Sequence, residues 1–313
     1  MPCIKKIIII VLMLTTTLFL YAQENQSENT KQQYQKELEQ ASLNVDKALQ
    51  KGPTTIKFNE LATLNIPKEF GFVPATQTKE LLKLFGHNGL DGVLGMITAN
   101  PDNDQDSQWM VLISYVDSGH IMDDDAKEWK SDELLESLRK GTEQNNVTRK
   151  ERGFPELNIL GWIEKPHYDM QTNRLLWSIK ALQQGASLDK ASVNYNTLAL
   201  SKEGYISMNL VTKLSLIDQD KVIPKTLLAS LHFNEGSRYS DFNEKTDKIA
   251  EYGLAALITG IAAKKLGFFA LAVAALLKFS KVIIAALVGF GYFFTKRKKA
   301  ASKIKENEEN KEA

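Results

Sequence analysis

The sequence predicts an α+β fold, in which an antiparallel sheet is flanked by helices and followed by a C-terminal transmembrane anchor. Three observations lead to this prediction. Apolar and polar residues alternate along several stretches that short turns connect, which is typical of hairpin strands. Other stretches space their apolar residues as helices do. From Ile249 to Phe294 nearly every residue is small or apolar, which is typical of a membrane region.

Strands are expected in the interior of the chain. The alternation is clearest around Trp177, and the stretch that starts at Trp109 is apolar on both faces, which suits a central strand. Two later strands are joined by a turn from Ser201 to Gly204, whose final glycine is typical of hairpins. The expected strands are 109–116, 158–164, 175–182, 193–200 and 205–212.

Helical spacing appears at Leu134, Leu135 and Leu138, and Pro224 stands near the first turn of another such stretch. The segment 23–53 is rich in Gln, Glu, Asn and Lys and has only a sparse apolar stripe. A polar, solvated helix or a partly disordered linker is therefore expected there. The expected helices of the domain are 76–85, 131–140 and 221–233.

The N-terminus has the pattern of a secretory signal peptide over residues 1–22. Lys5 and Lys6 precede an apolar run that ends at Leu20, and Ala22 is a small residue at the expected cleavage site. Cys3, the one cysteine of the chain, lies before that run. Cleavage would leave a mature chain without cysteine, so disulfides and cysteine-ligated metals are excluded from it.

The C-terminal region 249–295 is expected to meet the membrane. Residues 275–295 are long enough for one span, and the basic run that follows them, Lys296 to Lys299, is typical of a cytoplasmic end. The charged tail 296–313 would then be cytoplasmic. For the part before 275 we expect a helix in the membrane interface, with a hairpin of two spans as the alternative.

Between these ends we expect one extracytoplasmic α+β domain, residues 54–233. A short polar linker, 234–248, would hold this domain close to the membrane. Several side chains of the linker are expected to dock it against the domain, namely Arg238, Tyr239, Asp241 and Phe242.

The charge balance bears on possible partners. With Lys+Arg at 39 and Asp+Glu at 38, the chain lacks a basic surplus, so no nucleic-acid partner is expected. The stretch with Asp102, Asp104 and Asp106 lacks the glycine and the glutamate of a helix–loop–helix calcium loop. A solvated loop is expected there, with another kind of cation site as the alternative.

His120 stands near Asp123, Asp124 and Asp125, and a histidine beside carboxylates can act as a base or bind a metal. A zinc site needs three or four ligands and few other histidines are available, so no metal is expected. The aspartates also suit the N-terminus of a helix, where carboxylates cap free N–H groups. His120, Asp123, Asp124 and His167 are the catalytic candidates beside this capping interpretation.

Trp162, His167, Tyr168 and Asp169 surround Pro166. We expect Pro166 to fix a turn between two strands and Asp169 to hydrogen-bond the backbone of that turn. Aromatic residues with polar tips are enriched at contact surfaces. The four residues around Pro166 are therefore candidates for a ligand or partner surface.

The chain contains no G-x-S-x-G, no phosphate loop, no dinucleotide fingerprint and no H-E-x-x-H. No cofactor is expected, and no motif gives a positive reason to propose an enzyme.

Several segments in order also carry a resemblance: "VLISYVDSGHIMDDDAKEW", "GWIEKPHYDMQTNRLLWSI", "VNYNTLALSKEGYISMNLV" and "FNEGSRYSDFNEKTDKIAEYGLAALITGIAAKKLG". From about Asn59 to Phe294 the chain resembles bacterial membrane-anchored proteins that contain domain of unknown function 2167. The resemblance implies a domain facing the periplasm or the outside and an anchor in the bacterial inner membrane. It implies no activity, so no functional residues are carried over. The order of hairpins and a long helix also looks like the Mog1/PsbP-type sandwich.

We therefore expect a non-catalytic interaction or sensor module at the cell envelope. The alternative is an envelope hydrolase that uses His120 with Asp123 or Asp124, with His167 as a further candidate member of the site. The expected partners are the lipid bilayer and an envelope protein. Ala285 and Gly289 form a small-xxx-small pair, which would allow self-association through the membrane helix.

Overall fold

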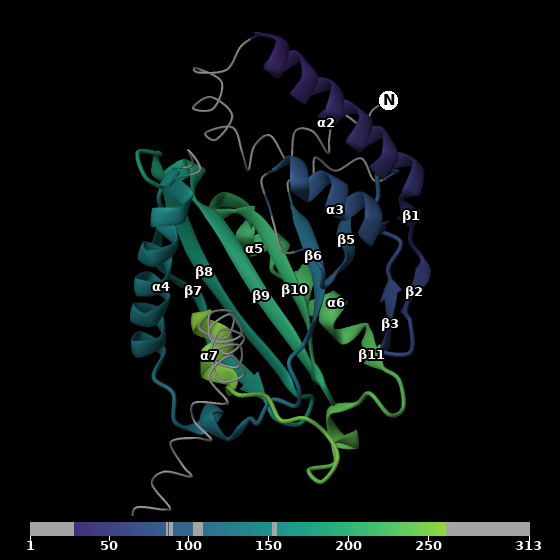
Figure 1. Ribbon diagram of the computed structural model, residues 1–313, viewed down its shortest axis with the longest axis vertical. Coiled ribbons are helices and arrows are strands. Elements are labelled where there is room, and N and C mark those ends of the chain that lie inside the picture. Colours follow the sequence, from purple (N-terminus) through teal and green to yellow (C-terminus); the bar gives the residue numbers. More distant parts are fainter. Residues whose placement is uncertain (1–27, 86, 88–89, 103–108, 152–154, 261–313) are drawn as a thin grey trace, which may run out of the picture. The chain divides into compact units, whose positions relative to one another are not determined.

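The computed structural model describes residues 28–260, apart from 86, 88–89, 103–108 and 152–154. Its central element is an eight-stranded antiparallel sheet in the order β1-β4-β5-β6-β10-β9-β8-β7 (Figure 1). The α+β class and the antiparallel sheet are therefore as predicted. The strands are β1 Gln50–Lys51, β4 Phe70–Pro74, β5 Val93–Ala99, β6 Met110–Asp117, β7 Leu157–Asp169, β8 Arg174–Gln183, β9 Ser192–Ser201 and β10 Gly204–Lys213.

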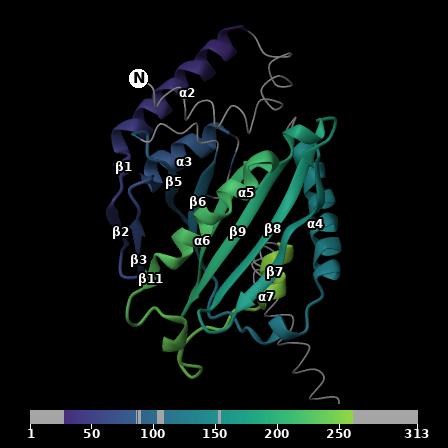
Figure 2. The ribbon, with the colours of Figure 1, turned by 180° about the vertical axis from the view of Figure 1, so that it is seen from behind.

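One face of this sheet packs against a small three-stranded sheet, in the order β11-β3-β2, and against two helices. Figure 2, the view from behind, shows these helices, α5 and α6, crossing this face. The core between the layers includes Leu64, Ile113, Leu210 and Leu227, each fully buried. The elements of this layer are β2 Thr54–Phe58, β3 Ala62–Ile66, α5 Ile217–Asp220, α6 Val222–Ala229 and β11 Leu231–Phe233.

Helices also lie over the opposite face, where α2 and α3 pack beside β4 and β5, α4 packs beside β7, and α7 packs beside α4 (Figure 1). The strand beside α4 is therefore the one that carries the candidate residues around Pro166. The bounds of these helices are α2 Glu28–Ala48, α3 Ala75–Leu84, α4 Ser131–Glu151 and α7 Leu254–Thr259.

The predicted strands and the predicted helices at 76–85 and 131–140 are all present, with ends that differ by a few residues or, for α4 and β7, extend further. The predicted helix 221–233 is only partly correct. It ends at Ala229, and the chain then forms strand β11, in which Leu231 pairs with Leu64 of β3. Strand pairing across the core thus overrides the helical spacing of the last residues.

The described part of the expected linker, residues 28–53, is not a free linker. Helix α2 has a buried stripe, with Leu38 6%, Ala41 1% and Val45 0% exposed, which packs against Leu81 and Met96. Strand β1 then pairs with β4. The helical alternative was therefore right, but the domain begins well before residue 54, because the sparse apolar stripe is enough to bury one helix face.

Pro166 does not form a turn, which corrects our prediction. It lies inside β7, between the register shifts that separate Glu164 from His167. β7 is the edge strand of the large sheet, and an edge or a bulge can hold a proline because it needs no ladder N–H there. The turn comes later, where Asp169 accepts hydrogen bonds from Gln171 N at 2.9 Å and from the Thr172 hydroxyl at 2.7 Å, as predicted for Asp169.

Side chains of α4 satisfy part of the free edge of β7. Asn146 donates to Leu157 O and accepts from Leu157 N, both at 2.9 Å. Arg139 donates to the carbonyl oxygens of Ile159 at 3.2 Å and Leu160 at 3.3 Å. Unpaired edge groups invite pairing with other chains, so these contacts protect the edge.

Residues 249–260, which we expected to belong to the membrane region, are part of the folded unit instead. Residues up to Gly260 belong to one compact unit, and Leu254 and Ile258 of α7 are 0% and 1% exposed. Among the described residues, no helix has the length and apolarity that crossing a bilayer requires. The expected signal peptide 1–22, the span 275–295 and the tail 296–313 lie outside the described residues.

We expect Asn146→Ala to destabilise the domain by about 1–3 kcal/mol, because both backbone groups of Leu157 lose their partner. The measurement is the free energy of unfolding from urea titration of the solubilised protein. The exposed neighbour variant Asn145→Ala is the control and should change this free energy by less than about 0.5 kcal/mol. Equal effects of the two variants would show that the edge contacts contribute nothing.

Candidate functional site

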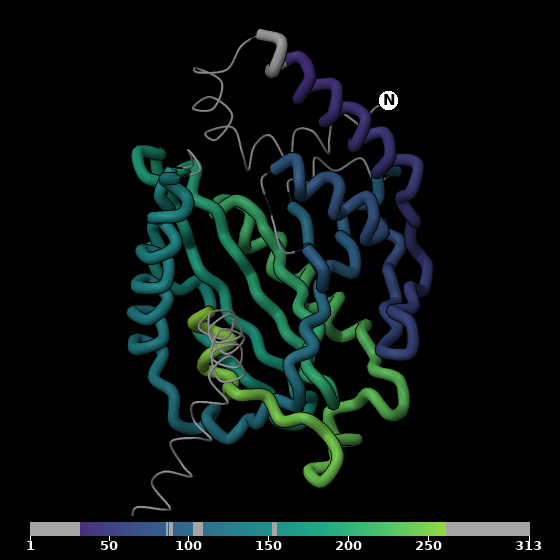
Figure 3. Tube along the Cα trace, in the orientation of Figure 1, coloured from purple at the N-terminus to yellow at the C-terminus, as the bar shows by residue number. Residues whose placement is uncertain are grey.

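The sequence candidate His120 lies where the chain that leads to α7 returns to the sheet. Its backbone N–H donates to Lys248 O at 2.7 Å, and its carbonyl accepts from Ala250 N at 2.8 Å, which forms a parallel bridge with Ile249. Gly119 permits this approach, since its φ is +88° and a Cβ there would lie 2.8 Å from Lys248 O. Figure 3 follows the chain from β11 through this contact to α7.

The imidazole of His120 is enclosed by two aromatic rings of the returning segment. Its centroid lies 3.8 Å from that of Phe242, with 8° between the planes, and 4.2 Å from that of Tyr239, with 30°. The Tyr239 hydroxyl also donates to Ile121 O at 2.7 Å. The predicted docking of the linker through these two residues is thus present, and His120 is only 4% exposed.

A hydrogen bond defines the protonation of the neutral His120 ring. Nδ1 lies 3.2 Å from Lys202 O, and because a carbonyl only accepts, Nδ1 carries the proton. Burial lowers the pKa of His120, while the bond to Lys202 and the charges of Asp123 and Asp247 raise it by smaller amounts. The ring is therefore neutral near pH 7.

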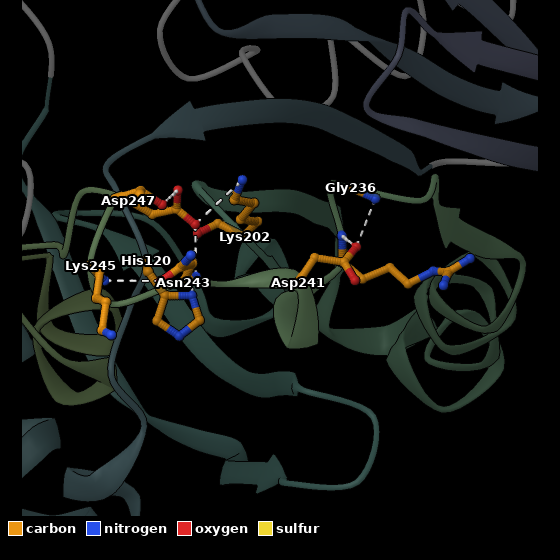
Figure 4. Close-up of polar contacts among 9 residues, drawn as sticks. His120, Lys202, Gly236, Asp241, Asn243, Lys245 and Asp247 are labelled. Atoms are coloured by element: carbon orange, nitrogen blue, oxygen red, sulfur yellow. Dashed lines mark hydrogen bonds and ion pairs between the residues drawn. The ribbon is translucent and has the colours of Figure 1, made fainter.

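An ion pair and hydrogen bonds also hold the returning segment against the domain (Figure 4). The Lys202 ammonium lies 3.3 Å from Asp247 Oδ2, and the Asp247 carboxylate also accepts from Asn243 N at 2.8 Å and from the Thr246 hydroxyl at 3.0 Å. The bond from Asn243 N is the largest cause that lowers the pKa of Asp247. We call His120, Lys202, Tyr239, Phe242 and Asp247, with the backbone of 248–250, the joint.

The three consecutive aspartates serve different partners instead of one site. Asp123 accepts the Tyr168 hydroxyl at 2.8 Å. Asp125 caps α7, accepting from Leu254 N at 3.1 Å and Ala255 N at 2.9 Å. Asp124 is exposed. Asp125 thus caps a helix, but not the predicted one: α7 lies far along the chain, and the short 3₁₀ helix Asp124–Lys127 has no side-chain cap.

His167 does not join His120, whereas Asp123 lies near enough to the ring of His120 to raise its pKa. His167 and Tyr168 are consecutive residues of β7 in regular register with β8, so their side chains point to opposite faces. Tyr168 reaches Asp123 beside the joint, whereas His167 is exposed on the other face. The structure therefore does not bring His167 into a common site with His120.

The remaining candidates around Pro166 also have structural partners. The Trp162 indole N–H donates to Ser131 O at 3.2 Å, at the start of α4. Asp169 stabilises the turn described above. Within the described residues, no group of three His, Cys, Asp or Glu side chains could hold a metal ion. Asp102 pairs with Lys51 at 2.6 Å, and Asp104 and Asp106 lie outside the described residues.

Sequence analysis missed the pairing of Lys202 with Asp247 and the contact of Tyr168 with Asp123. Neither pair has a signal in local spacing, since each joins segments more than 40 positions apart. The quoted segments around His120, Tyr168, Lys202 and Tyr239 nevertheless contain the residues that meet here.

A family model described as "Protein of unknown function (DUF2167)" matches residues 50–289. The chain belongs to this family. The match to the DUF2167 family includes every residue of the joint. The description of the family names no activity. A search of curated proteins finds no match.

Two solved structures are similar to this DUF2167 chain. Cyanobacterial PsbP from Synechocystis sp. PCC 6803 has 11% identity and a TM-score of 0.34, over 59% of this chain and 92% of that chain. The Ran-binding protein Mog1p from Saccharomyces cerevisiae has 8% identity and a TM-score of 0.33, over 62% of this chain and 100% of that chain.

We expect Asp125→Ala to lower the free energy of unfolding by about 1–2 kcal/mol, because α7 loses the cap of two N–H groups. Asp124→Ala removes an exposed carboxylate from the same run and is the matched control. Thermal unfolding of both solubilised variants measures the difference. If Asp124→Ala were the more damaging change, the assignment of the cap would be wrong.

Proposed function

We propose that this chain is a membrane-anchored protein of the bacterial envelope whose domain is a non-catalytic interaction or sensor module outside the cytoplasm. The observation that carries the proposal is the joint. The candidate histidine holds the chain that leads to the apolar C-terminal region, and its ring is buried between two aromatic side chains. A general base must reach its substrate. The enclosed position of His120 therefore favours a structural role, in which its side chain holds the returning segment against the domain.

The two ends of the sequence support the location. The apolar span 275–295 followed by Lys296–Lys299 favours an anchor with a cytoplasmic tail, and residues 1–22 have the pattern of an export signal. The proposed partners are the lipid bilayer and a protein of the envelope. Self-association through Ala285 and Gly289 is a further proposal.

The short path between domain and apolar region supports a held, not a roaming, module. Because residues 249–260 are part of the domain, only residues 261–274 separate it in sequence from the expected span 275–295. A domain held in this way would present a constant face to neighbouring envelope proteins.

Labelling of single cysteines tests the location. In a Cys3→Ser background, Lys245→Cys is expected to react with a membrane-impermeant maleimide in intact cells, because Lys245 is exposed. Lys299→Cys should react only after the cells are permeabilised. Reaction of both cysteines, or of Lys299→Cys alone, in intact cells would contradict the proposed orientation.

Assays with generic ester, phosphate and peptide substrates test the absence of catalysis. We expect the solubilised full-length protein and its His120→Phe variant to show the same background, within about twofold, since the imidazole is enclosed. The exposed His167→Phe variant is the control. Turnover that His120→Phe abolishes and His167→Phe preserves would replace the proposal with the hydrolase alternative.

A further inference from the structure

We propose that the joint is a proton-sensitive latch, in which protonation of His120 loosens the segment 234–250 from the domain. The inference deepens the proposed function, on which it rests, by naming the signal that a sensor module would read. It starts from geometry: one side chain contacts both docking aromatics, and the backbone of the same residue pairs with the returning chain.

The added proton charges a ring that the closed joint encloses. In the neutral ring Nδ1 already donates to Lys202 O, so the new proton goes to Nε2. A charged ring that is only 4% exposed and is stacked between two aromatic rings is poorly hydrated, and opening the joint to water relieves that cost.

The charged groups that face the ring come from three segments, and each already has a partner. Asp123, from the segment after β6, accepts the Tyr168 hydroxyl. Asp247, from the returning segment, is paired with Lys202, which lies at the turn after β9. Tyr239 donates its hydroxyl to a backbone carbonyl. The carboxylates attract an imidazolium, but less strongly than if they were free.

The aromatic rings act in the opposite sense, because ring faces attract cations. Desolvation is nevertheless the largest influence on His120, and its pKa in the closed joint lies below the ordinary value. The pKa of Asp247 is lowered from an already acidic value, and that of Tyr239 is raised from an already basic one. Of these three groups, His120 is therefore the one whose ordinary pKa lies near neutral pH.

The direction of the effect follows from this difference in pKa. The opened form, whose imidazole is solvated, binds the proton near the ordinary value of about 6.5, whereas the closed form binds it only at lower pH. Between these two values the equilibrium shifts toward the open form by up to about tenfold per pH unit. At pH values below the lowered pKa of His120 in the closed joint, the equilibrium has shifted fully and no longer changes with pH.

Hydrogen exchange of the full-length protein in detergent tests the latch. The readout is the protection of peptides that contain the amides of His120 and Ala250, corrected for intrinsic exchange, at about pH 7, 6 and 5. We expect protection in the wild type to fall about tenfold or more over this range. His120→Phe keeps a ring for the stack but cannot titrate, so its protection should change less than about twofold.

His167→Phe is the matched control, since it removes an exposed histidine, and it should follow the wild type. His120→Gln, which does not titrate and can donate to Lys202 O, serves as a second variant if the phenylalanine variant does not fold. A flat wild-type profile, or an equal fall in the variants of His120, would overturn the latch. Either result leaves the cysteine labelling unaffected, so failure of the latch and failure of the proposed location are distinguishable.

Discussion

The backbone bridge between His120 and Ile249 is the contact on which this end of the domain depends. It is possible because Gly119 has no side chain and has a positive φ, so that two chain segments approach within hydrogen-bond distance. With the bridge in place, Tyr239 and Phe242 enclose the imidazole. The same contact brings Gly253 and the first turn of α7 to Asp125, whose carboxylate would collide with any side chain at Gly253.

The polar groups near the bridge show that a histidine and three aspartates close in sequence have separate structural contacts. A buried carboxylate or imidazole is stable when its hydrogen bonds are satisfied, and here each has a different partner. Asp123 bonds Tyr168, Asp125 caps α7, and His120 bonds Lys202 O. The histidine and the two aspartates thus take part in three separate structural contacts. These contacts connect the chain between the sheet and α7 to its surroundings.

Local patterns predicted much of the fold because they depend on neighbours in the sequence. Period two identified β8, β9 and β10, and helical spacing identified α3 and the first half of α4. The same reasoning was wrong for the end of the 221–233 helix and for Pro166. In both places a partner strand decides the conformation: β3 pairs with Leu231, and the edge position of β7 accommodates a proline.

For the candidate site, the sequence by itself determined which residues have unusual potential: a histidine near carboxylates, aromatic residues in a polar linker, and a basic run after an apolar span. Only the tertiary structure decided how they are used. Lys202 meets Asp247, and Tyr168 meets Asp123, across separations that no local period reports. The physical reason is that burial, hydrogen bonds and nearby charges set the pKa of His120, and burial also sets its accessibility. These influences come from segments that meet only when the sheet has formed.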